Sequence, residues 1–266
     1  MKRFIPFMKK DPLVAVIRLQ GVIASGGRGA SALNDAGLAP MIERAFRRGK
    51  PVAVALVINS PGGSPAQSSL IAARVRRLSE ETKVPVFAFV EDVAASGGYW
   101  LATAAEEIWV DENSIVGSIG VISAGFGLHG FIERYGIERR VYTAGKSKSM
   151  ADPFKPENAE DVARIKDLQE TIHASFISQV KTRRGDKLAD GDLFTGEIWV
   201  GDKAREVGLV DGVGHLVPKM KEKFGDKVRL VPYQTRRPLL ARFGMSVIDA
   251  GISTLEERAH YARYGL

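Results

Sequence analysis

Short apolar runs alternate with amphipathic segments along the first half of the chain. Residues 13–19, 51–58 and 84–90 are compact runs rich in β-branched side chains, which is typical of buried strands. Between them, residues 36–48 and 66–81 place apolar side chains at helical spacing. This alternation of strands and helices predicts parallel βαβ units and therefore a layered α/β architecture.

The second half of the chain follows a less regular pattern. Residues 94–105 are rich in small side chains and are compatible with a helix, whereas residues 107–110 indicate a short strand. Residues 156–184 predict a long charged amphipathic helix that covers the sheet or a neighbouring subunit. We expect a single domain over residues 1–235 and a helical tail over residues 236–266 that contacts another subunit or a membrane.

Composition excludes several classes of chemistry. The 266 residues include no cysteine, which excludes disulfides, thiolate metal sites and cysteine-protease chemistry. No His-Glu-x-x-His spacing occurs, so no metal and no other cofactor is expected. The net charge of +7 suits an anionic partner, but the basic residues are dispersed and lack the interleaved aromatic residues of a nucleic-acid surface. We therefore expect no nucleic-acid partner, and a solvated or membrane-facing basic surface instead.

Two segments bear on membrane association. The basic start of the chain has only five residues between Arg3 and Lys9, too few for the apolar core of a cleaved signal peptide. The longest charge-free run, residues 51–73, is interrupted by the turn sequence Asn-Ser-Pro-Gly-Gly-Ser-Pro and does not predict a membrane span. The expected location is cytoplasmic, with a peripheral contact to the inner membrane through basic and apolar residues 236–243 left open.

Two glycine-bearing loops follow predicted strands, where open α/β sheets bind ligands. In the first, Gly62 and Gly63 precede a helix and let backbone amides approach negative charge, so the loop is either an oxyanion hole or a tight turn. In the second, Ser96 lies between Ala95 and Gly97, directly after a buried strand. It is either an exposed nucleophile whose neighbouring amide helps to hold an oxyanion, or the N-cap of a helix.

Candidate bases lie further along the chain. Residues 116–120 read Val-Gly-Ser-Ile-Gly, and the following loop carries Lys146 and Lys148. A lysine acts as a general base when burial disfavours its ammonium form. If neither lysine is buried, both are solvated cations, and their local context does not show which of them is the better candidate for the base. In the rival Ser/His/Asp chemistry, His129 is the only histidine with a plausible context, whereas His173 reads as a packed or half-exposed helix residue.

Four short motifs occur in a fixed order: Ser-Pro-Gly-Gly at 60–63, Ala-Ala-Ser-Gly-Gly-Tyr at 94–99, Gly-Ser-Ile-Gly-Val at 117–121 and Gly-Lys-Ser-Lys at 145–148. In this order they resemble the signal peptide peptidase A family of serine peptidases, over roughly residues 13–214. Each motif alone is weak, and the four together are specific.

The resemblance implies a role for each candidate residue. Ser96 is the nucleophile, Lys148 the general base, and Ser118 the group that orients this lysine, while the amides of Gly63 and Gly97 form the oxyanion hole. The resemblance also implies a crotonase- or Clp-protease-like layered ββα superhelix and a ring-shaped homo-oligomer whose nucleophile and base can come from different subunits. The implied partner is a peptide substrate with small apolar side chains, cut at a peptide bond.

Two other functions remain open from the sequence. A crotonase-type acyl-CoA enzyme fits because paired oxyanion glycines also suit thioester enolates. A non-catalytic oligomeric scaffold or adaptor fits if Lys148 is exposed and distant from every Ser96. Members of the resembled family usually carry an N-terminal membrane helix, for which this sequence offers no candidate, and residues 113–123 lack the histidine that the related Clp protease uses.

Overall fold

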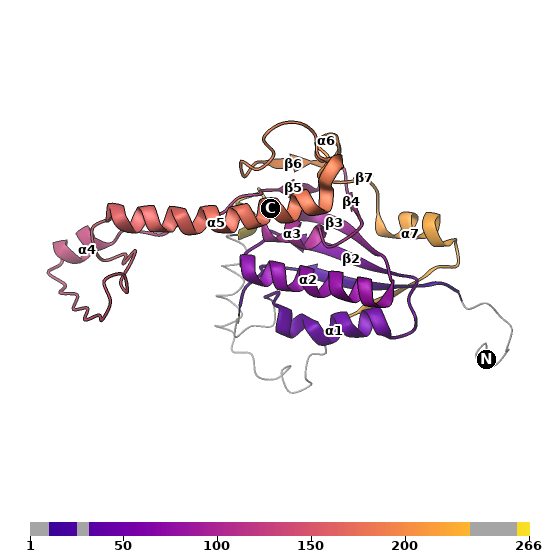
Figure 1. The fold of residues 1–266 in the computed structure, drawn as a ribbon, viewed down its shortest axis with the longest axis horizontal. Helices are drawn as coiled ribbons and strands as arrows, with labels where there is room; N and C mark the ends of the chain where they lie inside the picture. The colour runs from indigo at the N-terminus through magenta and orange to yellow at the C-terminus, as the bar shows by residue number, and fades with distance from the viewer. Residues whose placement is uncertain (1–10, 26–31, 235–259) are drawn as a thin grey trace.

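A computed structural model describes residues 11–25, 32–234 and 260–266 of the chain (Figure 1). In this part of the chain, eight strands form one sheet in the order β6-β5-β3-β2-β1-β8, with β4 beside β3 and β7 beside β4. Every pair of strands is parallel except β5 with β6. The predicted α/β class is therefore confirmed, with a mostly parallel sheet.

The bounds of the elements agree with the predicted alternation in the first half of the chain. The strands are β1 (Leu13–Gln20), β2 (Ala53–Ser60), β3 (Val86–Ala95), β4 (Glu107–Val110), β5 (Ile115–Gly117), β6 (Ile198–Val200), β7 (Gly212–Val213) and β8 (Arg229–Tyr233). The helices are α1 (Asp35–Arg47), α2 (Pro65–Thr82), α3 (Gly97–Ala102), α4 (His129–Arg134), α5 (Ala159–Arg184), the 3-10 turn η1 (Gly185–Lys187), α6 (Gly201–Glu206) and α7 (Leu216–Phe224).

The two faces of the sheet have separate apolar cores, because successive side chains of a strand point to opposite faces. In β1, Ala15, Ile17 and Leu19 join the larger core, which also contains the buried sides of α1, α2 and α3. Val14 joins a smaller core on the other face, where α7 covers the sheet with Met220. The loops at the carboxyl ends of β2 and β3 therefore rest on a rigid two-sided scaffold.

One predicted boundary is wrong. Residues 94–105 were expected to form a helix, but β3 continues to Ala95 and α3 begins only at Gly97. The small side chains of Ala94 and Ala95 suit either conformation, and pairing decides between them, because the second half of β3 pairs with β5 through Ala94 and Val116. The serine that follows is thus placed at a strand end rather than inside a helix.

Helix α5 contacts α3 through its C-terminal half, whereas its N-terminal half pairs with residues 146–151, for example through Glu160 and Lys146. Phe176 stacks on Trp100 of α3 with ring centroids 4.9 Å apart, and Phe176, Val180 and Arg184 are its buried residues. The N-terminal half extends away from the sheet and carries residues 121–158, including α4, at its far end (Figure 1). We call residues 121–158 the arm. The predicted covering helix therefore covers the body with only half of its length.

Several expectations about the ends of the chain fall outside the described residues. The signal-peptide argument concerns residues 1–10, and most of the predicted tail, residues 235–259, is likewise not described. Within the described ranges, no helix combines the length and apolar character needed to cross a bilayer. The charge-free run 51–73 is strand β2, a loop and the first half of α2, as expected.

Candidate active site

Ser96 occupies a sharp turn between β3 and α3. Its backbone lies at φ 52° and ψ −122°, a conformation that a residue with a side chain adopts only when the surrounding structure imposes it. The Ser96 amide donates to the carbonyl of Gly117 at 2.8 Å, which ties the turn to the end of β5. The Ser96 hydroxyl makes no capping bond to α3. The N-cap interpretation therefore does not account for this serine.

The loop after β2 packs directly against the Ser96 turn. A Cβ on Gly62 would lie 2.8 Å from the amide nitrogen of Gly97 and 2.8 Å from the carbonyl oxygen of Ala95. Gly63 has φ +136°, and a Cβ there would lie 2.1 Å from the carbonyl oxygen of Ile23. Both positions need glycine because a side chain there would clash with the backbone of a neighbouring segment. An ordinary tight turn does not require this close approach between two segments.

The backbone of Gly63 lies close to that of Gly97. A Cβ on Gly97 would lie 3.4 Å from the Gly63 nitrogen and 2.4 Å from the Ser68 hydroxyl oxygen. Among the described residues, neither amide donates to an acceptor. Two neighbouring unpaired amides beside a serine hydroxyl are what an oxyanion hole requires.

Ser118 follows β5 and is held by its backbone. Its own φ is 51°, its amide donates to the carbonyl of Glu197 at 2.6 Å, and its carbonyl accepts from the amide of Gly120 at 2.9 Å. Since the preceding carbonyl, that of Gly117, accepts the Ser96 amide, Ser118 lies next to the Ser96 turn. The structure thus places Ser96, Gly97, Gly63 and Ser118 near one another.

The last turn of the chain lies against the same loops. The Tyr261 hydroxyl donates to the carbonyl of Asn59 at 2.7 Å. The Tyr264 hydroxyl lies 3.5 Å from both the Pro61 carbonyl oxygen and the Ser118 hydroxyl. Sequence reasoning missed both tyrosines, because a short segment 140 or more residues away from its partners, with no motif of its own, gives no signal of its target.

Lys148 lies apart from the other four predicted residues. It is exposed and belongs to the arm, where its neighbour Lys146 forms an ion pair with Glu160 at 3.2 Å. Along α5, the 14 helical steps from Ala159 to His173 span about 21 Å between the far end of the helix and the body. Within one chain, the structure does not bring Lys148 to Ser96.

None of the described histidines replaces Lys148 as a base within the chain. His129 is exposed and also lies in the arm. His215 Nε2 contacts Asp111 Oδ2 at 2.8 Å, and this hydrogen bond, together with the backbone and side-chain hydrogen bonds from Asn113, lowers the pKa of Asp111 to about 2. His173 Nε2 lies 3.0 Å from the carbonyl oxygen of Ile119. His260, next to Tyr261, is exposed. Among the described residues, no histidine forms a hydrogen bond to Ser96.

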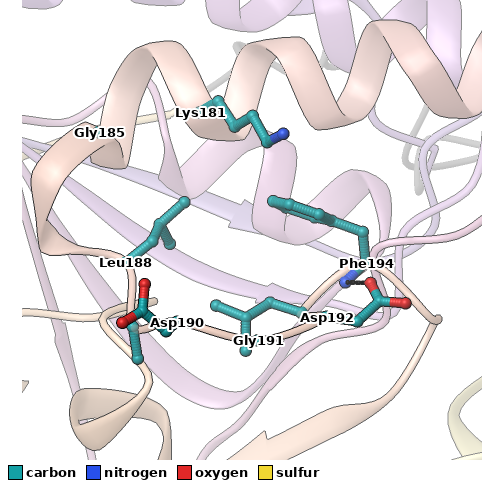
Figure 2. Close-up of a pocket in the computed structure, with 9 residues that line it drawn as sticks. Lys181, Gly185, Leu188, Asp190, Gly191, Asp192 and Phe194 are labelled. Atoms are coloured by element: carbon teal, nitrogen blue, oxygen red, sulfur yellow. Dashed lines mark hydrogen bonds between the residues drawn. The ribbon is translucent and has the colours of Figure 1, made fainter.

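A hollow of about 600 Å³ lies elsewhere, between the C-terminal end of α5 and the loop 188–194 (Figure 2). Lys181 stands over the Phe194 ring at 5.4 Å from its centroid, and Asp192 accepts the Phe194 amide at 3.2 Å. None of the predicted site residues lines this hollow. In the described part of the chain, no group of three or more histidine and carboxylate side chains is arranged to hold a metal ion.

Known proteins resemble this chain along its whole length. The Na(+)/H(+) antiporter NhaA of Brucella melitensis is 48% identical over 286 residues, which cover 100% of this chain but only 39% of that longer protein. A putative protease of Synechocystis is 30% identical over 243 residues, covering 86% of this chain and 82% of that protein.

Among solved structures, a mutant of the 1510-N membrane-bound stomatin-specific protease has a TM-score of 0.50 at 14% identity, covering 84% of this chain and 99% of that one. At this identity the likeness supports the fold alone. The model of peptidase family S49 matches residues 79–223, a span that contains Ser96, Ser118 and Lys148. Because this match takes in more than half of the sequence, the chain belongs to peptidase family S49.

Proposed function

We propose that the chain is a serine endopeptidase that hydrolyses peptide bonds through an acyl-enzyme on Ser96. The Ser96 hydroxyl oxygen attacks the peptide carbonyl carbon, and the amine of Lys148 takes the hydroxyl proton. The lysine then gives this proton to the leaving amine, and a water activated by the same lysine hydrolyses the ester.

The observation that carries this proposal is the backbone of Ser96. A φ of 52° costs about 1–3 kcal/mol for a residue with a side chain, and such strain persists where it orients a reacting group. At the end of a strand and the start of a helix, this geometry projects a hydroxyl away from its own backbone. Residues 93–102 are otherwise buried, yet Ser96 is only half-buried, so a substrate can reach it.

Two amides support the charge that develops in this reaction. The Gly63 and Gly97 nitrogens flank the serine, and their donors are free among the described residues. In comparable sites, one such donor contributes about 2.7–4 kcal/mol to the transition state. The strands and helices beneath both loops hold these amides in place before the substrate binds.

The base in this proposal comes from a second copy of the chain. Lys148 lies in the arm, well away from the Ser96 of its own chain, and the arm exposes large apolar side chains, with Phe126 86%, Phe131 57% and Tyr142 91% exposed. An exposed apolar surface of this kind favours a protein partner. A head-to-tail contact in which each arm reaches the next subunit closes into a ring. Burial against that subunit would disfavour the ammonium form and let the amine accept a proton.

The proposed substrates are signal-peptide-like segments or other peptides with small apolar side chains, as the resemblance to signal peptide peptidases implies. Family membership favours a peptidase over an acyl-CoA enzyme. The scaffold function becomes the better explanation if the arm never brings Lys148 to a serine.

The proposal is tested by co-expressing Ser96→Ala and Lys148→Ala chains with different tags and purifying mixed particles. Each variant alone should be inactive on a fluorogenic peptide. In a random mixed ring, a site is complete only when its serine comes from a Lys148→Ala chain and its lysine from a neighbouring Ser96→Ala chain. Each of these choices is made half of the time, so about a quarter of the sites should be active.

Two controls isolate the roles of the residues. Lys146→Ala removes a neighbouring exposed lysine and should retain wild-type activity. A mixture of Ser96→Ala with the Ser96→Ala/Lys148→Ala double variant should stay inactive. Full activity of purified Ser96→Ala would refute the peptidase assignment, whereas inactive mixed particles would refute the assignment of Lys148 to a neighbouring subunit.

A further inference from the structure

His173 joins α5 to the short segment that carries Ser118. Its Nε2 lies 3.0 Å from the carbonyl oxygen of Ile119, which is fully buried. A carbonyl oxygen can only accept, so Nε2 carries the proton in this contact. Ile119 is the residue after Ser118, and the hydrogen bond therefore acts on the Ile119–Gly120 peptide unit, one unit beyond the peptide bond that follows the serine.

This hydrogen bond completes a set of contacts around Ser118. The Ser118 amide donates to Glu197, and the Ser118 carbonyl accepts from Gly120. With the following carbonyl fixed by His173, the backbone is held on both sides of a residue whose φ is 51°. A strained residue keeps its conformation only where its surroundings determine it fully. Among the described residues, His173 is the side chain that contacts the backbone of this segment, and the Tyr264 hydroxyl lies 3.5 Å from the Ser118 hydroxyl.

His173 lies at the point along α5 where the helix reaches the body, close to the segment from which the arm leaves. The arm leaves the body directly after Gly120 and returns through the N-terminal half of α5, which is mostly exposed before residue 173. Phe176 and Gln179 contact α3, one to two turns further along the helix. The His173 bond to Ile119 therefore joins the segment from which the arm leaves to the point where α5 reaches the body.

We infer that His173 is a positioning residue for the peptidase reaction: by holding the Ile119 carbonyl, it fixes the direction of the Ser118 hydroxyl and the root of the arm that carries Lys148. The kinetic part of this inference rests on the proposed function. The structural part, that His173 orders residues 117–121, does not depend on any activity.

The structural part is tested by amide hydrogen exchange of the intact protein. In His173→Ala, peptides covering residues 117–121 should exchange about fivefold faster than in the wild type, the change expected when one hydrogen bond is lost. His173→Gln places an amide nitrogen the same number of bonds from Cβ as Nε2 and should restore protection. Gln179→Ala is the matched control, because it removes the α5 bond to the Thr103 hydroxyl and leaves Ile119 untouched.

The kinetic part is tested with the same variants on a peptide substrate. His173→Ala should lower kcat about fivefold with KM nearly unchanged, and His173→Gln should recover most of the loss. In a Ser118→Ala background, His173→Ala should have less than about a twofold further effect, since two residues acting through one group are not additive.

The outcomes separate the two proposals. Wild-type exchange of residues 117–121 in His173→Ala would overturn the inference whether or not the chain is a peptidase. An equal loss of kcat with and without Ser118 would overturn the route through Ser118. Activity that persists in Ser96→Ala would instead refute the proposed function and leave the exchange result standing by itself.

Discussion

The carboxylate of Asp211 is a structural centre whose removal should have a large, measurable effect. It accepts from Arg184 Nη1 at 2.8 Å, from Lys187 Nζ at 2.6 Å and from the amide of Ile108 at 2.7 Å. The Arg184 side chain is only 2% exposed and also donates to the Gly208 carbonyl. Asp211 thus links the C-terminal end of α5 to β4 and supplies the counter-ion of a buried cation.

Asp211→Asn keeps the size of the side chain but leaves Arg184 without a counter-ion. Removing one partner of a buried ion pair costs about 3–5 kcal/mol. The remaining amide oxygen still accepts one hydrogen bond, so we expect the lower end, about 3 kcal/mol. For a chain of this size the melting temperature should fall by about 6–12 °C. Lys187→Met is the matched control: it removes a half-exposed partner of the same carboxylate and should cost less than about 1 kcal/mol.

The measurement is urea unfolding followed by circular dichroism, with melting temperature as a second observable. The urea slope should stay constant, so that the shift of the midpoint reports stability rather than a change of unfolded state. If Asp211→Asn and Lys187→Met lose the same small amount, the Arg184 charge is solvated in the folded protein and the reasoning from burial is wrong.

Three further outcomes follow from the structure. Burial acts to raise the pKa of Asp211, but its hydrogen bonds outweigh burial, so the pKa in the folded protein lies below the usual value. The ionised carboxylate therefore contributes its full stabilisation above about pH 4, the pKa of an unfolded aspartate. This stabilisation is lost as the pH falls through the lower pKa of the folded state. Acid titration of stability should therefore be shallower in Asp211→Asn. Gly63→Ala should lower kcat about 100-fold in a folded protein, because the new methyl group would meet the Ile23 carbonyl and displace an oxyanion donor; unchanged kcat would place the donor elsewhere. Deleting residues 260–266 should lower KM for peptides, because Tyr261 covers the Asn59 carbonyl at the end of β2 and Tyr264 lies over the Pro61 carbonyl in the loop that carries Gly63. An unchanged KM would place the peptide's path away from this turn.

Much of the fold was predictable because the sheet has two apolar faces. The buried strands β1, β2 and β3 gave continuous apolar runs, and α1 and α2 gave clear helical spacing. The end of β3 was not predictable, since Ala94 and Ala95 have no preference strong enough to decide between strand and helix. Neither α7 nor β6 was predicted, because short elements give too few periods to recognise.

The sequence offered a list of candidate site residues but not their geometry. Each loop taken alone had an ordinary structural explanation, and only the order of the four motifs made Ser96, Ser118 and the two glycines specific. What distinguishes them physically lies between loops: the backbone of Gly62 against that of Gly97, and the Ser96 amide on the Gly117 carbonyl. Such contacts join residues far apart in the sequence and leave no local pattern.

For His173, the sequence predicted the burial of the side chain but not its hydrogen-bond partner. Its place beside the apolar stripe of α5 indicated a half-exposed helix residue, and the structure finds it half-buried, as expected. Its hydrogen bond to Ile119 depends on where α5 crosses the end of β5, which is a property of the assembled fold. Helical spacing identifies the face on which a residue lies but not the backbone group that it meets.

The separation between Ser96 and Lys148 also carries a physical argument about assembly. In a single chain, Lys148 is exposed on the arm. The same arm exposes the apolar side chains of Phe126 and Tyr142. One event, the docking of an arm on a neighbouring body, would bury those side chains, strip water from the amine and bring it to a serine whose amides are already in place. On this proposal, a separate chain holds a preorganised hydroxyl without a base, and the oligomer is the smallest unit that can cut a peptide.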